Sequence, residues 1–161
     1  MEAIKLLERQ HDEIDGLFAQ YETAEDAAQK LEVFHQLADA LIAHATIEQK
    51  LFYPAVFVGE LKEQLLEAVS DHLRVKRLIS ELFDLSPLEA KFDATIDRLQ
   101  DEVTEHASEE EDVLFPLVKE ALLAYELEAL GEAMEEMYEE VISGTTPRDE
   151  LSDVDDALPV Q

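Results

Sequence analysis

Apolar residues recur at alternating spacings of three and four along most of the chain, and this periodicity constrains the fold more than any other feature. Such spacing places apolar side chains along one face of an α-helix. Interruptions are few, because the 161 residues include only four Gly and five Pro. The pattern predicts long helices at 2–22, 25–53, 60–84 and 87–115, with a fifth from Pro116 to about Ser143.

Local signals set the expected helix ends. In Ser86-Pro87-Leu88-Glu89, Ser is a favoured N-cap, Pro fits the first helical position, and Glu stands three residues after the cap. Thr23 with Asp26 forms a weaker version of the same signal. These signals predict that the second and fourth helices begin near residues 25 and 87.

Four apolar faces joined by short connections predict an all-α fold, an antiparallel up-down four-helix bundle. The fifth, C-terminal helix has an apolar face of its own. It could lie across the bundle or pair with a second copy in a homodimer. After Gly144 the sequence turns to Thr-Thr-Pro and scattered acids, so we expect a bundle over residues 1–144 and a disordered acidic tail over 145–161.

The acidic composition excludes several kinds of partner. The 40 Asp and Glu against 12 Lys and Arg give a net charge of -28, which argues against nucleic acid and anionic membranes. No apolar run approaches the ~18–20 residues that a membrane span needs. Residues 1–10 resemble the first turns of a helix and not a signal peptide. The lack of Cys excludes disulfides, thiolate chemistry and iron–sulfur clusters, and we expect a cytoplasmic protein.

Six polar residues occupy positions on the apolar faces where Leu or Ile is expected. Burying an ionised carboxylate without a partner is prohibitive, so these positions require a cation or a dense hydrogen-bond network. Metal binding is the favoured interpretation, and a buried network is the alternative. The six residues are His11, His44, Glu48, His72, His106 and Glu110.

These residues form a repeat. His44-Ala-Thr-Ile-Glu48 recurs as His106-Ala-Ser-Glu-Glu110, and each has a Pro ten residues after the His. His11 and His72 stand 33 and 34 residues upstream of their partner histidines. Residues four apart share one helix face, so each motif presents an imidazole and a carboxylate to one point. Two facing carboxylates can bridge ions roughly 3.5–4 Å apart, and this mixture of ligands suits iron, manganese or zinc.

The paired motif, with an aromatic residue and Pro downstream, resembles the hemerythrin-like, or HHE cation-binding, family of di-iron four-helix proteins over about residues 2–118. The resemblance implies two non-heme iron ions joined by an oxo or hydroxo bridge, with Glu48 and Glu110 as bridging carboxylates. It also implies four terminal ligands: His11, His44, His72 and His106. The oxygen-carrying members have His-x-x-x-His on the third helix, and Lys76 takes the place of the second of these histidines.

Four further residues lie near the predicted site in the sequence. Lys76 could stabilise a bound anion, but we expect it to point to the surface. Tyr53 could gate the site or bind a metal, although packing at the end of the bundle is favoured. Glu111 could replace Glu110 as a bridge, but the helical register favours Glu110. His35 lies off the apolar face and is expected on the surface.

The predicted centre is compatible with three functions. Without a fifth histidine, the centre should have open positions for oxygen, peroxide or nitric oxide, which predicts binding or sensing of a small molecule. An enzyme that decomposes hydrogen peroxide or oxidises ferrous iron would use the same open positions, and no sequence feature separates the two. The third is a metal-free interaction module whose polar residues set helix specificity.

Overall fold

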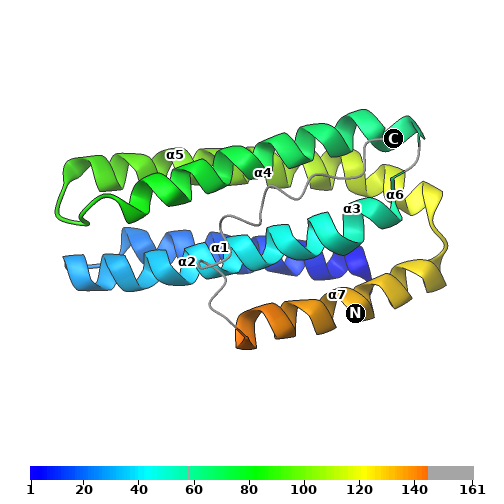
Figure 1. The fold of residues 1–161 in the computed structure, drawn as a ribbon, viewed down its shortest axis with the longest axis horizontal. Helices are drawn as coiled ribbons and strands as arrows, with labels where there is room; N and C mark the ends of the chain where they lie inside the picture. The colour runs from blue at the N-terminus through cyan, green and yellow to red at the C-terminus, as the bar shows by residue number, and fades with distance from the viewer. Residues whose placement is uncertain (58, 145–161) are drawn as a thin grey trace.

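The computed structural model describes residues 1–57 and 59–144, and these residues contain helices and no strand. The four long helices of the bundle are α1 (Ala3–Glu22), α2 (Ala27–Ile47), α4 (Lys62–Phe83) and α5 (Ala90–Glu109). Figure 1 shows that they lie along one axis, each antiparallel to the helix before it. The predicted fold class, a helical bundle with a further C-terminal helix, is confirmed.

Two of the long helices continue through a π-helical segment. After α2 come η1 (Glu48–Phe52) and α3 (Tyr53–Ala55), and after α5 come η3 (Glu110–Leu114) and α6 (Phe115–Ala121). A short 3-10 turn, η2 (Gly59–Leu61), precedes α4. Each π-helical segment begins at the Glu of a His-x-x-x-Glu motif, so the repeat in the sequence is also a repeat in the backbone.

The prediction that the fourth helix ends at residue 115 is wrong, because α6 continues it to Ala121. Pro116 lies in the first turn of α6. Proline lacks an N–H and its ring crowds the preceding turn, but the wide π turn already breaks the regular hydrogen-bond pattern just before it. The fifth helix, α7 (Ala124–Ser143), therefore begins later than predicted.

Two predicted helix starts are shifted as well. The hydrogen bonds of the Ser86 cap form, with Ser86 N–H donating to Glu89 Oε2 (2.7 Å) and Leu88 N–H donating to Ser86 Oγ (3.2 Å). They close a turn before the helix, and α5 begins only at Ala90. At the start of α2 the N-cap is Asp26, whose Oδ1 accepts from the Gln29 N–H at 2.8 Å.

Two apolar cores fill the bundle, and the polar site residues lie between them. One core, nearer the N-terminus of α1, includes Leu7, Phe52 and Phe115. The other includes Ile14 and Val75. Along α1, for example, the order Leu7, His11, Ile14 passes from one core through the polar layer to the other. The site is thus a polar layer within an otherwise apolar bundle interior.

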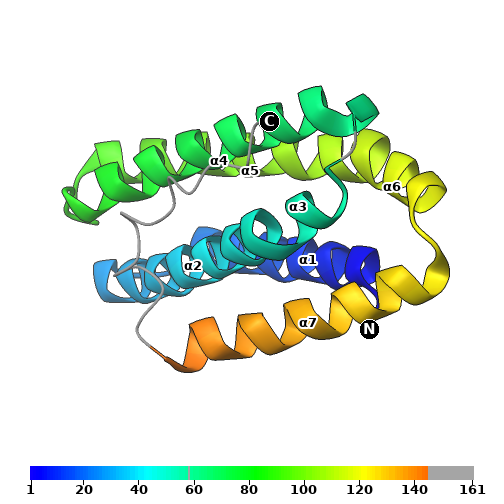
Figure 2. The same cartoon turned by 45° about the vertical axis from the view of Figure 1, so that its right-hand side comes forward.

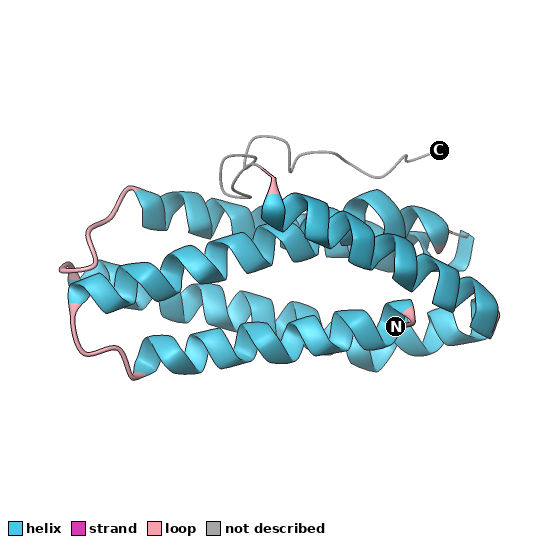
Figure 3. Cartoon of the chain, turned by 90° about the horizontal axis from the view of Figure 1, so that it is seen from below, coloured by secondary structure: helices cyan, strands magenta, loops and turns pink. Residues whose placement is uncertain are grey.

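Helix α7 packs against its own bundle, alongside α1 and α2 (Figure 2 and Figure 3). Leu127 and Met134 are buried in the first apolar core. Gly131 allows the closest approach, because a Cβ there would lie 2.0 Å from the carbonyl oxygen of Met1. The proposed homodimer through this helix stays a prediction.

The predicted acidic tail, residues 145–161, lies outside the described residues. None of the described helices is both long enough and apolar enough to span a membrane.

Candidate metal centre

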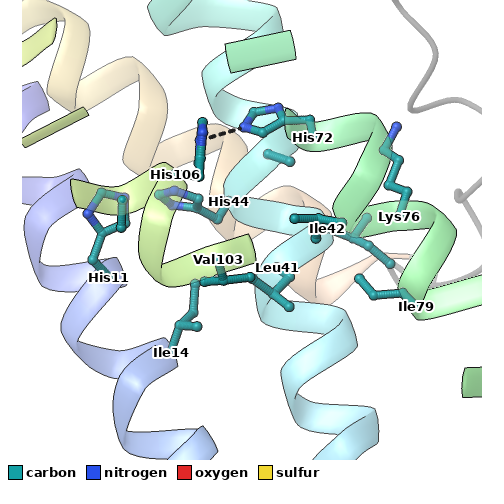
Figure 4. Close-up of a pocket in the computed structure, with 13 residues that line it drawn as sticks. His11, Ile14, Leu41, Ile42, His44, His72, Lys76, Ile79, Val103 and His106 are labelled. Atoms are coloured by element: carbon teal, nitrogen blue, oxygen red, sulfur yellow. Dashed lines mark hydrogen bonds between the residues drawn. The ribbon is translucent and has the colours of Figure 1, made fainter. Parts of the chain in front are cut away.

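The six polar residues predicted for the site converge from α1, α2, α4 and α5 and from the first residues of both π-helical segments. All are buried, with at most 7% of any of them exposed. Figure 4 shows that the four histidines lie together on one side of the cavity described below. The structure therefore brings together the whole predicted set.

The six side chains fall into two groups, and within each group the candidate ligand atoms lie within 4.8 Å of one another. The first group is His11, His44 and Glu110, and the second is Glu48, His72 and His106. Each group thus combines two imidazoles with one carboxylate, a donor set that suits iron, manganese or zinc.

Glu48 lies between the two groups. Its Oε1 is 3.1 Å from His44 Nε2 and 3.1 Å from His72 Nε2, one histidine of each group. Because one carboxylate oxygen faces imidazoles from both groups, this side chain is placed where a bridging ligand would lie.

Glu110 has the equivalent position in the second half of the repeat. Its Oε1 lies 3.2 Å from His11 Nε2 and 3.4 Å from His106 Nε2, again one histidine of each group. Glu111, the alternative bridge, instead places Oε1 2.9 Å from His11 Nδ1 on the outer side of that ring. The arrangement favours Glu110 over Glu111 as the bridge.

The outer nitrogen, Nδ1, of each of the four candidate histidines faces an acceptor that the sequence did not identify as such. Gln10 Oε1 lies 2.6 Å from His44 Nδ1, and Asp71 Oδ2 lies 3.0 Å from His106 Nδ1. Gln10 directly precedes His11 in the sequence, and Asp71 directly precedes His72. An N–H at Nδ1 leaves Nε2 with its lone pair directed inward, as metal binding requires.

The remaining two histidines are held across the halves. Gln49 Oε1 lies 2.7 Å from His72 Nδ1, and Glu111 holds His11 in the same way. Both acceptors directly follow the Glu of a motif. The repeat in the sequence could have indicated all four acceptors, because each occupies the same place relative to the motif in both halves.

Tyr53 corrects a prediction, since it is part of the site and not only end-of-bundle packing. Its side chain is fully buried, and its hydroxyl donates to Glu110 Oε2 at 2.8 Å. The Tyr53 hydroxyl oxygen also lies 3.3 Å from His72 Nε2. Tyr53 follows η1 directly, so the π turn that carries Glu48 also aims this phenol at the centre.

Lys76 also departs from its prediction, because it is buried and not surface-directed. Only 6% of the residue is exposed, and it lines the same cavity as the four histidines (Figure 4). His35 is half-buried and stacks on Phe83, with ring centroids 6.1 Å apart, well away from the site. His35 is therefore neither fully exposed, as predicted, nor near the candidate ligands.

The charges within the layer are strongly coupled. Burial opposes the charge on His11, but Glu110 outweighs it and raises the pKa of His11 to about 9. Burial likewise opposes the charge on His106, and Glu110 and Asp71 raise its pKa to about 9. For His72 burial dominates and lowers the pKa to about 4. In the metal-free protein the layer thus holds protons in place of cations.

The two carboxylates respond differently to the same environment. Burial acts to raise the pKa of Glu48, but His44 outweighs it and holds that pKa well below the usual range. Burial and the charge of Glu48 raise the pKa of Glu110. Burial also places the pKa of the Tyr53 hydroxyl well above its usual value, so the phenol keeps its proton.

Several inward-facing atoms of the layer make no hydrogen bond of suitable geometry among the described residues, although imidazole nitrogens and carboxylate oxygens approach to 3.1–3.4 Å there. Such buried polar atoms are rare in native proteins, because losing water without a replacement is costly. A purely structural hydrogen-bond network would leave no such atoms. Cations bound between the side chains would give each of these atoms a partner. The atoms are His11 Nε2, His44 Nε2, Glu48 Oε2 and Glu110 Oε1.

A cavity of about 30 Å³ adjoins the layer. The four histidines form one side, and aliphatic side chains such as Ile14, Leu41 and Val103 form the other (Figure 4). The volume holds one or two water-sized molecules. A small, weakly polar ligand could therefore lie directly against the candidate metal ligands.

A helical bundle that buries two groups of His and Glu side chains defines a cation-binding helical domain. The sequence model of the family described as Hemerythrin HHE cation binding domain matches residues 2–118, with a second match over residues 69–157. The chain belongs to this family.

Two known proteins are similar to this chain. A hemerythrin HHE cation-binding domain-containing protein from Mycobacterium kansasii has a crystal structure with a TM-score of 0.82 and 26% sequence identity, covering 96% of this chain and 99% of that one. A protein named DNA nickase from Nostoc sp. (strain PCC 7120) is 30% identical over 120 residues, which is 73% of this chain and 34% of the relative. The chain thus spans about a third of that relative.

Proposed function

We propose that this protein holds two iron ions in the buried layer and uses them to bind or sense oxygen or a related small molecule, such as peroxide or nitric oxide. The observation that carries the proposal is the position of Glu48 and Glu110. Each carboxylate lies 3.1–3.4 Å from one histidine of the first group and one histidine of the second. His11, His44, His72 and His106 would be the terminal ligands, two for each ion.

The chain's own residues prepare the layer for this role. The acceptors at Nδ1 fix the orientation of all four rings, so little rearrangement is needed when a cation binds. The aliphatic wall of the 30 Å³ cavity excludes bulk water and leaves space for a small ligand. When bound, the iron ions would supply the redox chemistry and the open coordination positions that such ligands require.

A second candidate, supported by Tyr53, is a di-iron enzyme that decomposes hydrogen peroxide or oxidises ferrous iron. Peroxide decomposition requires proton movement at the reacting oxygen atoms. The Tyr53 hydroxyl is a proton donor fixed at 2.8 Å from Glu110 Oε2 inside the layer, and general acids at this reach contribute to such reactions. The same phenol could equally position a ligand, so binding stays the first proposal.

The DNA-directed activity named for the Nostoc relative is not part of this proposal. The matched region is about a third of that protein. The net charge of -28 opposes approach to the phosphate backbone.

The first experiment measures metal content after expression with added iron. We expect close to two iron ions per chain and an absorption spectrum that changes when peroxide is added. His72→Ala and Glu110→Ala should each lose at least one metal and lower the melting temperature. His35→Ala is the matched control, because His35 lies away from the layer and should leave the iron content unchanged.

The same preparations separate the two functions. A sensor or binder, once reduced, should give a stable spectral change with oxygen. The enzyme should instead give steady oxygen release from peroxide or rapid oxidation of added ferrous iron. Less than one metal per chain, or unchanged iron in both the His72→Ala and Glu110→Ala variants, would contradict the metal centre and favour the interaction module.

A further inference from the structure

A second cavity, of about 240 Å³, lies between α4 and the α5–η3 segment and reaches the candidate centre. Its lining includes two candidate ligands, His106 and Glu110, which are buried. It also includes Glu67, Glu109 and Val113, which are exposed. The cavity therefore connects the surface of the molecule with the second half of the layer.

The polar atoms along this cavity are suited to a cation. Glu110 is only 2% exposed, and its Oε1 lies 3.2 Å from His11 Nε2 and 3.4 Å from His106 Nε2 but makes no hydrogen bond of suitable geometry among the described residues. Gln64 Oε1 is a second buried oxygen without such a hydrogen bond. Asp71 also lines the cavity, where Arg74 and His106 are its partners, and no Lys or Arg is among the described lining residues. An acidic opening thus leads to unsatisfied buried oxygens.

We propose that this cavity is the route by which divalent metal ions enter the centre, with Glu67 and Glu109 capturing the ion at the opening and Glu110 receiving it. The inference rests on the proposed metal centre. It assigns Glu67 and Glu109 a part in uptake but none in holding the bound metal.

The alternative approach, through the 30 Å³ cavity, is unfavourable for an ion. Apart from the histidines and Lys76, its lining is aliphatic, and moving a cation through surroundings with so few polar partners is costly. Carboxylates around an opening raise the local concentration of cations and can accelerate their association by tenfold or more. Ions would therefore reach the centre through the acidic cavity, and small neutral molecules through the apolar cavity.

The test follows the rate of uptake in metal-free full-length protein. Cobalt(II), or ferrous iron without oxygen, is mixed with the protein in a stopped-flow instrument, and binding is followed by absorption. We expect Glu67→Gln/Glu109→Gln to slow uptake about tenfold. The final stoichiometry should stay that of the unmodified chain.

The matched control is Glu63→Gln/Glu105→Gln. Each of these residues lies one helical turn before its counterpart, is exposed and does not line the cavity. Both double variants lose the same charge, so a general field effect would slow them equally. Val113→Lys, which places a positive charge at the opening, should also slow uptake, whereas Leu88→Lys at an exposed site away from the cavity should not.

Each outcome has a defined meaning. Slower uptake in the Glu67/Glu109 variant alone, with full final occupancy, supports the route. Equal rates in both double variants, or a lower final stoichiometry in the Glu67/Glu109 variant, would overturn it while leaving the metal centre in place. If the unmodified chain takes up no metal, the proposed centre itself fails.

Discussion

Each group of candidate ligands contains one histidine held by a carboxylate and one held by an amide. In the first group the acceptors are Glu111 and Gln10, and in the second they are Asp71 and Gln49. A carboxylate acceptor makes an imidazole a stronger base and a better ligand than an amide does. The first half of the sequence supplies both amides and the second half supplies both carboxylates. Because one acceptor of each half contacts a histidine of the other half, each group receives one amide and one carboxylate.

Tyr53 offers a test at the scale of one residue. In Tyr53→Phe the buried Glu110 Oε2 loses its donor, and leaving such a group unsatisfied costs about 1–3 kcal/mol. We expect the metal-free variant to lose about that much free energy of unfolding in a urea titration. Tyr125→Phe is the control, because Tyr125 is 70% exposed and should change little. Equal stability of both variants would show that the phenol contributes nothing to the layer.

The π-helical segments each bring several neighbouring residues to the site. In an α-helix, successive side chains point about 100° apart, and the regular helices α1 and α4 contribute one adjacent pair each, Gln10 with His11 and Asp71 with His72. At η1, Glu48, Gln49, Phe52 and Tyr53 are all buried. The wide turn lets Glu48 face the inner atoms of the layer while Gln49 reaches the outer nitrogen of His72. π-bulges frequently occur at functional sites.

Helix α7 can be tested through two glycines. In Gly131→Ala the new Cβ would lie 2.0 Å from Met1 O and 2.7 Å from Ala3 N, both backbone atoms that cannot move aside easily. Overpacking of this kind costs about 1–3 kcal/mol, so we expect a lower melting temperature.

Gly16→Ala is the matched control for this substitution. A Cβ at Gly16, inside α1, has no atom within 4 Å. It should raise stability by about 0.5–1 kcal/mol, because Ala is the better helix former. A thermal melt of the two variants should therefore show shifts of opposite sign. A stable Gly131→Ala variant would mean that α7 is not seated against the N-terminus as described.

At the scale of the whole molecule, the polar layer should make the metal-free fold sensitive to pH. His11 and His106 have folded pKa values of about 9, above the unfolded value of 6.5, so their contribution is complete below pH 6.5 and is lost as pH rises through 9. His72 has a folded pKa of about 4. Its preference for the neutral form therefore weakens the fold as pH falls from 6.5 toward 4.

The three histidines together should therefore favour the metal-free fold most near pH 6.5, with their contribution falling on both sides. Thermal melts between pH 4 and 9 in the presence of a chelator would measure this. His11→Gln should flatten the alkaline limb specifically. A stability that rises steadily from pH 6.5 to 9 would contradict the charge coupling described for the layer.

The sequence alone determined the helical architecture and the convergence of the six side chains. Apolar periodicity reports which face of each helix must leave water, and His11 or Glu48 on such a face must be buried with it. Because the motif occurs twice, each half of the chain contributes side chains to the same layer. Their role as metal ligands is still a prediction.

Only the tertiary structure decided which further groups face that layer. Tyr53 and Lys76 were misplaced because their directions depend on the π turn and on packing between helices, neither of which a spacing of three and four encodes. The end of α6 and the start of α7 were misplaced because Pro116 normally ends a helix, but here it follows a turn already widened. Local sequence fixes which face is buried, whereas contacts between distant segments fix what each buried polar atom meets.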